Sequence, residues 1–394
     1  MSRGRIKAPL IDCIEVNPKE TITKGCISKK IGMDKIQPFC RDISEYELSE
    51  FTGGSKFRNG DTIMARITPC LENGKIAMVN VLNKNEVGFG STEYIVFRAK
   101  EGLTTPDFVY YLVCSSLVRD PAIKSMVGSS GRQRVQTDVV KNLEINFPPL
   151  PEQAKIASVL RLLDDKIALN NKINNNLLEQ VLALYRNRFV DTVNNERRIC
   201  RADEYFDISI GKTPPRKEPQ WFSTNPQDVT WVSISDMGTC GLYIGSSSEQ
   251  LTKEAVDRHN VKIVPDNTVL LSFKLTVGRI AITNGEMTTN EAIAHFKTDK
   301  KEINEYLYCY LKCFNYQTMG STSSIATAVN SKIIKGMPFV VPTDDELIDF
   351  HSVAAPMFAK IKANQTESEK LTAVRDTLLP KLMSGELDVS DISL

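Results

Sequence analysis

The sequence predicts an α+β protein in which two tandem domains of mixed α/β structure are separated by two long helices that pair as an antiparallel coiled coil. Three observations lead to this fold class. The chain repeats itself with a period of roughly 200 residues, each copy holds strand-like segments, and each copy ends in a long helical segment. The expected segments are a first domain at 1–147, a first long helix at 148–190, a second domain at 191–341, and a second long helix with the C-terminal tail at 342–394.

Composition places the chain among ordinary globular proteins. It has 394 residues, of which 41% are hydrophobic and 25% charged, so it holds enough apolar material for real cores. Lys and Arg number 49 against 48 Asp and Glu, a net charge of +1 that excludes a polybasic protein but not a basic face. There is no signal-peptide pattern and no apolar run of about 18 residues, so we expect no membrane span and a cytoplasmic location.

Cysteine and histidine usage argues against a metal centre. The nine cysteines form no CxxC pair, which predicts reduced thiols. The three histidines, His259, His295 and His351, stand at no ligand spacing from a cysteine cluster. We therefore expect no metal.

The duplication is clearest where each copy leaves its domain and enters its long helix. In one register Val135 pairs with Val329 and Pro148 with Pro342. Upstream the register drifts, as loop insertions would cause: Gly74-Lys-Ile-Ala77 resembles Gly278-Arg-Ile-Ala281, Thr92-Glu93 resembles Asn290-Glu291, and Phe108-Val-Tyr110 resembles Tyr306-Leu-Tyr308.

The first long segment, 152–189, contains neither Pro nor Gly, and apolar residues recur at coiled-coil spacing in both copies. An Asn at the same place in each seam would fix the register of the pair. Pro356 is expected to kink or delay the second helix, and Pro380 and Gly385 to end it. The predicted seam consists of Ile156, Leu160, Leu163, Ile167, Asn170, Leu177, Leu184, Met357, Ile361, Asn364, Leu371 and Leu378. The alternative, that each helix merely covers its own domain, stays open at this point.

Each domain is expected to combine short strands with one helix of moderate length. In the first copy the expected strands are Thr62–Thr68, Lys75–Val81 and Glu93–Arg98, followed by a helix at 106–116. In the second copy they are Val229–Ile234, Thr268–Phe273, Arg279–Thr283 and Ile293–Lys297, followed by a helix at 302–314.

Catalytic motifs are absent from the sequence. There is no Asn/Asp-Pro-Pro-aromatic motif of an amino-methyltransferase, no phosphate-binding P-loop, no nucleophile elbow and no His-Glu-x-x-His. The paired carboxylates Asp164-Asp165 and Asp344-Asp345 are interpreted as solvated or favoured by a helix dipole. The chain is therefore expected to carry no active site.

Basic and amide residues concentrate in the presumed loops of both domains, where they could hold phosphates or read base edges. The candidates for DNA contact are Lys56, Arg58, Arg66, Lys75, Arg132, Gln133, Arg134, Gln136, Lys212, Thr213, Arg216, Lys217, Lys274, Arg279, Ser323 and Lys332. Plain surface charge is the alternative for any one of them, but their occurrence in duplicate favours DNA.

Several motifs give the chain a family resemblance that covers essentially its whole length. They are Gly60–Ala77, Gly90-Ser-Thr-Glu93, Gly211-Lys-Thr-Pro214, Phe147-Pro-Pro-Leu-Pro-Glu-Gln153 and Leu379-Pro-Lys-Leu-Met-Ser-Gly-Glu-Leu387. Together with the duplication, the chain resembles the specificity subunit of type I restriction–modification systems.

The resemblance implies two target-recognition domains, each reading one half of a bipartite asymmetric sequence in double-stranded DNA. It implies that the helix pair sets the spacer and docks two modification subunits, which hold S-adenosylmethionine, and that restriction subunits using ATP and Mg join this core. The chain itself would bind no cofactor and perform no chemistry. Self-association of the isolated chain is also expected.

The sequence departs from the family pattern at three places, and two other functions remain open. Pro356 interrupts the second helix, Thr343–Leu347 replaces the fuller entry motif of the first helix, and Asn17-Pro-Lys-Glu20 stands where a Gly-Lys-Thr-Pro would fall.

The alternative functions are a degenerate DNA methyltransferase, which would bind S-adenosylmethionine, and a protein-binding tether without DNA readout.

Overall fold

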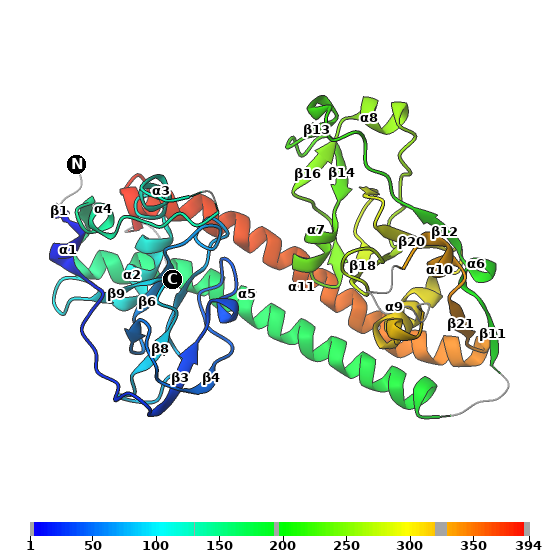
Figure 1. Ribbon diagram of the computed structural model, residues 1–394, viewed down its shortest axis with the longest axis horizontal. Coiled ribbons are helices and arrows are strands. Elements are labelled where there is room, and N and C mark those ends of the chain that lie inside the picture. The colour runs from blue at the N-terminus through cyan, green and yellow to red at the C-terminus, as the bar shows by residue number, and fades with distance from the viewer. Residues whose placement is uncertain (1–3, 130, 193–196, 320–328, 390–394) are drawn as a thin grey trace. The chain divides into compact units, whose positions relative to one another are not determined.

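The computed structural model describes residues 4–129, 131–192, 197–319 and 329–389, and the chain divides into two compact units (Figure 1). Unit 1 comprises Met1–Ala168 and Ser368–Leu394, and unit 2 comprises Leu169–Glu367. Parts of both long helices belong to each unit. The units thus group the chain differently from the four consecutive segments expected from the sequence, whose boundaries stay a prediction.

Unit 1 is built on two four-stranded sheets and a short two-stranded one. The main sheet has the antiparallel order β2–β9–β6–β7, the second has the order β4–β3–β8–β5, and β1 pairs with β10. The strands are β1 (Ile6–Pro9), β2 (Ile14–Val16), β3 (Ile27–Ile31), β4 (Glu47–Glu50), β5 (Lys56–Phe57), β6 (Thr62–Ala65), β7 (Ile76–Met78), β8 (Gly88–Gly90), β9 (Tyr94–Ala99) and β10 (Glu144–Phe147). The helices are α1 (Leu10–Cys13), α2 (Pro106–Cys114), α3 (Arg119–Lys124) and α4 (Thr137–Lys141).

Unit 2 repeats this plan with an added edge strand. Its sheets have the orders β12–β20–β17–β18–β15, β13–β16–β14–β19 and β11–β21. The strands are β11 (Arg198–Arg201), β12 (Asp207–Ile210), β13 (Phe222–Ser223), β14 (Val229–Val232), β15 (Tyr243–Ile244), β16 (Glu249–Leu251), β17 (Val269–Ser272), β18 (Ile280–Thr283), β19 (Thr288–Thr289), β20 (Ile293–Lys297) and β21 (Pro338–Val341). The helices are α6 (Ala202–Tyr205), α7 (Ile234–Thr239), α8 (Lys253–Arg258), α9 (Asn304–Cys313) and α10 (Ser331–Lys335).

The two main sheets correspond strand by strand. In both units the domain's first main-sheet strand pairs with the last one, β9 or β20, which pairs in turn with the central β6 or β17. The register also agrees, since Thr62 lies opposite Phe97 and Val269 lies opposite Phe296. The strands β6, β17 and β18 lie inside their sheets and are fully buried, and so is β7 although it forms the edge of its sheet. The predicted α+β duplication is confirmed.

The long helices are α5 (Leu150–Tyr185) and α11 (Asp344–Ser384), with a π-helical turn following α5. The expectation that Pro356 delays the second helix is wrong, because α11 runs from Asp344 through Pro356, whose side chain is exposed; the expected kink stays a prediction. A proline removes one backbone hydrogen bond. Here the buried residues Ala354 and Phe358 flank Pro356 and hold the turn. Pro380 also lies within α11, which ends before Gly385 at a positive φ of 80°.

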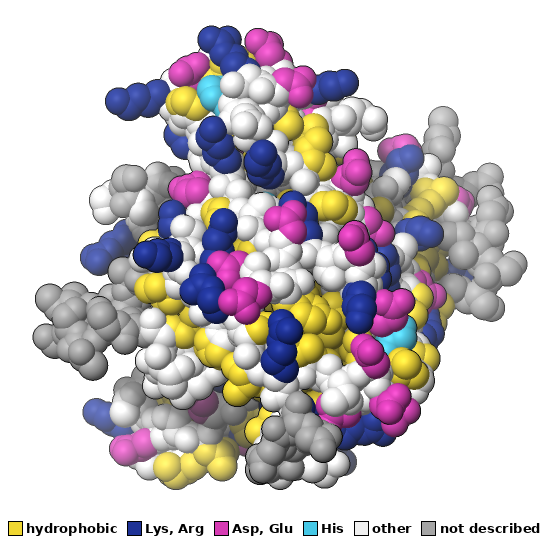
Figure 2. All heavy atoms as spheres, turned by 90° about the vertical axis from the view of Figure 1, so that its right-hand side faces the viewer, with side chains coloured by type: hydrophobic (Ala, Val, Ile, Leu, Met, Phe, Trp, Pro, Cys, Tyr) yellow, Lys and Arg dark blue, Asp and Glu magenta, His cyan; other side chains and the backbone are white. Residues whose placement is uncertain are grey.

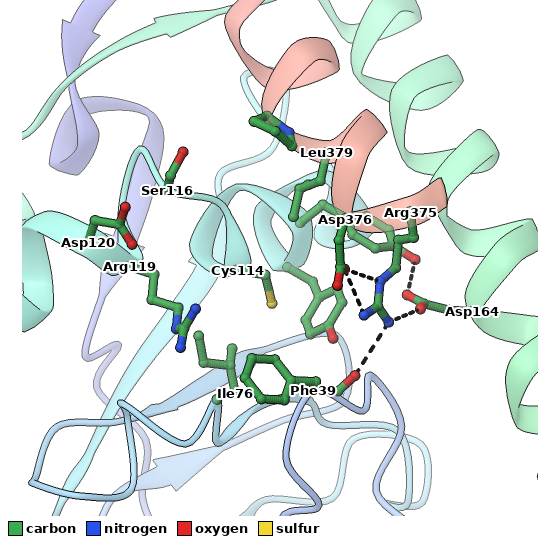
Figure 3. A pocket seen from close by; sticks show the side chains of 14 residues that line it. Phe39, Ile76, Cys114, Ser116, Arg119, Asp120, Asp164, Arg375, Asp376 and Leu379 are labelled. Atoms are coloured by element: carbon green, nitrogen blue, oxygen red, sulfur yellow. Dashed lines mark hydrogen bonds and ion pairs between the residues drawn. The ribbon is translucent and has the colours of Figure 1, made fainter. Parts of the chain in front are cut away.

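In unit 1 the first part of α5 packs against the last part of α11. Ile156 and Leu160 are fully buried in one core with Leu382 and with the apolar face of α2. The side chain of Arg375 donates a hydrogen bond to Asp164 at 2.8 Å, and the second Asp164 oxygen accepts one from Tyr111 at 2.7 Å (Figure 3). The interpretation of Asp164 as a solvated carboxylate is therefore wrong.

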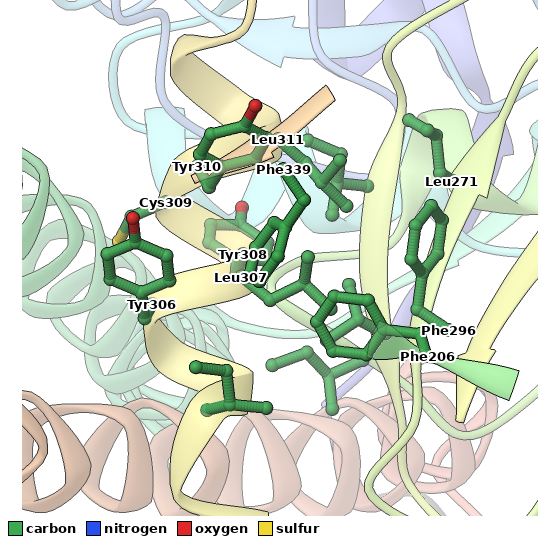
Figure 4. Close-up of a cluster of buried hydrophobic side chains, with 14 of the residues drawn as sticks. Phe206, Leu271, Phe296, Tyr306, Leu307, Tyr308, Cys309, Tyr310, Leu311 and Phe339 are labelled. Atoms are coloured by element: carbon green, nitrogen blue, oxygen red, sulfur yellow. The ribbon is translucent and has the colours of Figure 1, made fainter. Parts of the chain in front are cut away.

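In unit 2 the last part of α5 packs against the first part of α11. Asn364 donates to Asn174 Oδ1 at 2.8 Å, and Asn170 donates to the Asn364 carbonyl at 3.4 Å. All three asparagines are buried. The seam asparagines thus contact each other, and the antiparallel direction agrees with unit 1. The seam then continues into a core that includes Phe350 and the aromatic face of α9 (Figure 4).

Two arginines link the helix ends in the same manner. Arg5 donates to Glu152 near the start of α5 and, at 2.8 Å, to the carbonyl of Met383 at the end of α11. Arg197 donates to Glu346 near the start of α11 and to the carbonyl of Arg188 just after α5. A cation at a helix C-terminus satisfies free carbonyls and opposes the helix dipole. Each pair of helix ends is therefore held by one arginine.

Among the described residues, no helix is both long and apolar enough to cross a membrane.

Candidate nucleic-acid interface

In unit 2 the predicted basic residues converge on one carboxylate, Glu291. The Thr213 hydroxyl donates a hydrogen bond to it, and the charges of Lys274 and Arg216 act on it. Partial desolvation favours the neutral form, but these donors and charges outweigh that effect, so the pKa of Glu291 lies below its ordinary value. The segment after β12, the β17–β18 loop and the turn before β20 thus form one cluster, which we call the Glu291 cluster.

Arg216 is the most firmly positioned cation of this cluster. Its two terminal nitrogens donate to the two oxygens of Glu249 at 2.9 and 2.8 Å. Its guanidinium carbon lies 4.1 Å from the ring centre of Phe222 and 4.7 Å from that of Trp231. The side chain is still 51% exposed. A guanidinium that is stacked on aromatic rings in this way is preorganised to donate two parallel hydrogen bonds to a planar acceptor group.

Lys212 and Lys217 flank the same segment with exposed side chains. The backbone of Lys212 is fixed, since its N–H donates to the Thr289 carbonyl at 2.9 Å and its carbonyl accepts from the Trp231 ring nitrogen at 3.2 Å. Both lysines fit phosphate contacts, because a flexible ammonium acts as a point charge.

The remaining unit 2 candidates lie elsewhere. Arg279 turns inward and donates to the carbonyl of Ile234 at 2.5 Å, where it packs on Gly238 and supports α7. Lys332 is exposed in α10 and lines a separate pocket with Arg201. Ser323 lies outside the described residues. The structure therefore brings together Lys212, Thr213, Arg216 and Lys274 but not these three.

In unit 1 the carboxylate just before β9, Glu93, pairs with two predicted arginines. Arg134 donates to both Glu93 oxygens, the shortest contact being 2.7 Å, and Arg66 lies 3.7 Å away. The hydrogen bond from Arg134 is the main reason why the pKa of Glu93 lies below its ordinary value. Arg66 and Arg134 remain one-third or more exposed. We call this group the Glu93 cluster.

The segment that carries Arg134 is bound to the β6–β7 loop by its backbone. Thr68 donates to the Gln133 carbonyl at 3.0 Å, and Val135 donates to the Arg66 carbonyl at 2.9 Å. Arg132 and Gln136 are exposed on either side of it, and Gln133 is half-buried. Three further predicted residues of this segment therefore lie beside Arg134 and the rest of the Glu93 cluster.

Three other unit 1 candidates are held by the protein itself. Lys56 donates to the backbone carbonyl of Glu20 at 2.9 Å, Arg58 pairs with the Glu20 carboxylate, and Lys75 donates to the Met33 carbonyl at 2.7 Å. These contacts fix the segment between β2 and β3 and the short helical turn that follows β3. Of the three, only Arg58 is largely exposed.

The assignment of all candidates to loops is wrong at two positions. Lys56 lies in β5 and Lys332 in α10. Lys56 is followed by the buried Phe57, whose packing against the sheet makes this segment a strand. Asn330 caps α10 by accepting from the Ile333 N–H at 3.0 Å, which starts a helix at Ser331.

The sequence reasoning missed the acidic partners. Glu20, Glu93, Glu249 and Glu291 each contact one or more of the predicted residues. The paired motifs Thr92-Glu93 and Asn290-Glu291 could have indicated two of them. Figure 2 shows the same intermixing on one face of the molecule, where Lys and Arg side chains alternate with Asp and Glu. Because of this pairing, the net charge stays near zero although the loops are basic.

His295 lies beneath the Glu291 cluster in β20 and is fully buried. Its ring nitrogens share hydrogen bonds with the hydroxyls of Ser209 and Thr289 at 3.0 and 2.7 Å. Burial, helped by the charge of Lys297, lowers the pKa of His295 to about 3, so the imidazole is neutral at physiological pH. Across the described parts of the chain, no cluster of His, Cys, Asp and Glu is arranged to hold a metal ion.

Comparison with known proteins finds relatives that cover most of the chain. A family model described as the type I restriction modification DNA specificity domain matches residues 9–179 and again 198–372. The HindI specificity subunit of Haemophilus influenzae is 22% identical, with 84% of this chain and 87% of that subunit covered. The MjaIX specificity subunit of Methanocaldococcus jannaschii is 27% identical over 74% of this chain and 71% of that subunit. A type I restriction–modification S subunit from M. genitalium shares the fold, with a TM-score of 0.52, 15% identity and 96% of each chain covered.

Proposed function

We infer that the chain, which belongs to the family of type I restriction modification DNA specificity domains and carries that domain twice, selects the DNA sequence on which such a system acts. One observation carries the inference. In each copy a carboxylate just before the corresponding strand β9 or β20, Glu93 or Glu291, lies among exposed cations of the candidate set. Two such clusters give one chain two separate places for DNA.

Each unit is proposed to read one half of a bipartite, asymmetric site in double-stranded DNA. Arginine and glutamine side chains supply donors that match guanine and adenine edges, and lysines supply phosphate contacts. The two clusters contain different residues, Arg66 and Arg134 in unit 1 against Arg216 and Lys274 in unit 2. Different residues predict two different half-sites, which makes the whole site asymmetric.

The helix pair is proposed to set the spacer between the half-sites and to dock two modification subunits. The register of α5 and α11 is supported by the buried contacts of Asn170 and Asn364 and by the arginines that link their ends. Restriction subunits would join the same assembly. Self-association of the isolated chain remains a proposal as well.

The chain is proposed to be non-catalytic. On this account S-adenosylmethionine belongs to the modification subunits, where it supplies the methyl group, and ATP and Mg belong to the restriction subunits. We place the chain in the cytoplasm, where the host DNA lies. The support is chemical: the carboxylates of the candidate interface are paired with arginines, lysines or hydroxyls instead of being arranged as a general acid and base.

The test is salt-dependent DNA binding by the full chain in complex with its modification subunits. Neutralising several phosphates should make the logarithm of the affinity fall linearly with the logarithm of the salt concentration, by about 0.9 per phosphate contact. An affinity that does not depend on salt would favour the protein-binding tether instead. The degenerate-methyltransferase alternative predicts heat on mixing the isolated chain with S-adenosylmethionine in a calorimeter, and our proposal predicts none.

A further inference from the structure

Leu275 stands out as an apolar side chain that nothing covers. It lies in the loop between β17 and β18 and is 98% exposed, more than any other large hydrophobic side chain among the described residues. Its neighbours Lys274 and Thr276 are exposed too. A single exposed leucine is ordinary on a protein surface; what distinguishes Leu275 is the backbone conformation that presents it.

The backbone holds Leu275 in a conformation that leucine rarely adopts. Its φ is 60°, and the Thr276 N–H donates to the Lys274 carbonyl at 2.6 Å, which closes a γ-turn around Leu275. A γ-turn with positive φ is a strained form for a residue with a side chain. Strain of this kind persists only where the surrounding structure enforces it, and it concentrates at functional sites.

The surrounding structure does enforce this turn. The buried Ser272 donates its hydroxyl proton to the Thr276 carbonyl at 2.6 Å and accepts from the Arg279 N–H at 3.1 Å. The Gly278 N–H also donates to the Ser272 carbonyl at 3.0 Å. One buried serine thus fixes both sides of the loop, so Leu275 is presented rigidly.

The corresponding loop of the other copy also carries a leucine, but it is longer. When Gly74–Ala77 is aligned with Gly278–Ala281, Leu275 corresponds to Leu71. Leu71 is fully buried in the core of unit 1. The longer β6–β7 loop of unit 1 thus packs its leucine inward, whereas the shorter β17–β18 loop of unit 2 turns its leucine outward.

The charges around Leu275 indicate what it meets. Lys274 precedes it in the chain and belongs to the Glu291 cluster, together with Arg216. A phosphate bound by Lys274 would place the leucine that follows it against the adjacent base step. DNA-binding proteins use leucine in this way, as a wedge that partly unstacks a step and kinks the duplex. A membrane or protein surface would instead call for a wider apolar patch, whereas this loop offers one apolar side chain flanked by Lys274 and Thr276.

We propose that Leu275 inserts between adjacent base pairs of the half-site bound by unit 2. The proposal rests on the proposed function, because it requires that unit 2 binds DNA. Its consequence is specificity without base contacts: a flexible pyrimidine–purine step is easier to unstack, so the wedge favours such a step in the half-site.

The test uses the full chain in complex with its modification subunits, on duplexes that carry 2-aminopurine at successive positions of the site. We expect a fluorescence rise of several-fold at one step of the unit 2 half-site. Leu275→Ala should remove that rise and weaken binding about tenfold, and Leu275→Met, which keeps an apolar side chain of similar length, should retain both. The matched control is Leu48→Ala, which shortens a leucine of unit 1 that is 70% exposed and should change neither.

Each outcome decides the proposal. A fluorescence profile unchanged by Leu275→Ala overturns it, and so does weaker binding without loss of the unstacking signal, which would leave Leu275 as a surface contact only. A lower melting temperature of the free protein on Leu275→Ala also overturns it, since Leu275 would then pack within the chain. The proposed function fails separately, if the wild-type complex shows no salt-dependent DNA binding.

Discussion

Glu93 and Glu291 lie just before the corresponding strands β9 and β20 of the two units, and each carboxylate accepts hydrogen bonds from side chains that we assign to DNA recognition. Arg134 holds Glu93 by paired hydrogen bonds, whereas Glu291 accepts from Thr213 and lies in the field of two cations. Both units thus have a carboxylate before the same strand of the main sheet, but different side chains surround it. This is the arrangement expected of a duplicated protein whose two copies read different sequences.

The first prediction concerns the carboxylate that positions the unit 1 arginines. Glu93→Gln removes a negative charge, so non-sequence-specific DNA affinity should rise, by up to about tenfold at low salt. Discrimination at the unit 1 half-site should fall, because Arg134 and Arg66 lose the group that orients them. Competition binding with altered half-sites measures both effects. Glu101→Gln, at an exposed turn of the same unit, serves as the control and should change neither.

The second prediction separates base reading from phosphate binding in unit 2. Arg216→Lys keeps the charge but loses the two-bond fork and the stacking on Phe222 and Trp231. Discrimination at the unit 2 half-site should therefore drop about tenfold or more, with little change in the salt slope. Lys217→Ala should instead weaken binding to all sequences equally and lower the salt slope by about 0.9. If the two variants behave alike, Arg216 is a phosphate contact and our assignment is wrong.

The third prediction concerns the buried ion pair between α5 and α11 in unit 1. The side chains of Asp164 and Arg375 are only 8% and 11% exposed. Asp164→Asn leaves a buried cation poorly compensated and should reduce the free energy of unfolding by about 3 kcal/mol. Asp165→Asn, one residue along and 45% exposed, should cost less than about 1 kcal/mol. Urea unfolding followed by circular dichroism measures both, and equal costs would contradict the burial of Asp164.

The fourth prediction concerns the acid side of the stability profile. His295 has a folded-state pKa of about 3, whereas an unfolded histidine binds a proton below about pH 6.5. The unfolded state then holds more protons, so the free energy of unfolding falls as the pH drops from about 6.5 toward 3. His295→Gln should flatten this part of the profile. His259→Gln, at a half-buried histidine beside Trp221, should leave the slope in place. An unchanged slope in His295→Gln would show that other groups cause it.

The sequence predicted the architecture well because its signals are periodic and duplicated. The apolar seam through Ile156 and Leu160 and the asparagines at 170 and 364 depend on helical spacing alone, and the structure pairs them. The seven strands that the sequence predicted were also placed within a few residues, since their buried runs are short and bounded by turns, but the other strands of the described structure were not predicted.

Other features depend on tertiary contacts that spacing does not carry. Proline is a poor helix residue in isolation, yet packing around Pro356 overrides that preference. Asp164 seemed solvated because its partner, Arg375, lies far away in the sequence. Leu71 and Leu275 align in the sequence, but their loops differ in length, and only the fold shows that one leucine is buried and the other exposed.

The most direct test of the central claim is modified-base sequencing of host DNA with the chain and its modification subunits co-expressed. The account predicts methylated adenine at one bipartite motif, present only when this chain is present. It further predicts that Arg134→Ala alters one half of the motif and Arg216→Lys the other. Methylation that is independent of this chain, or a motif in which both substitutions change the same half, would contradict the account.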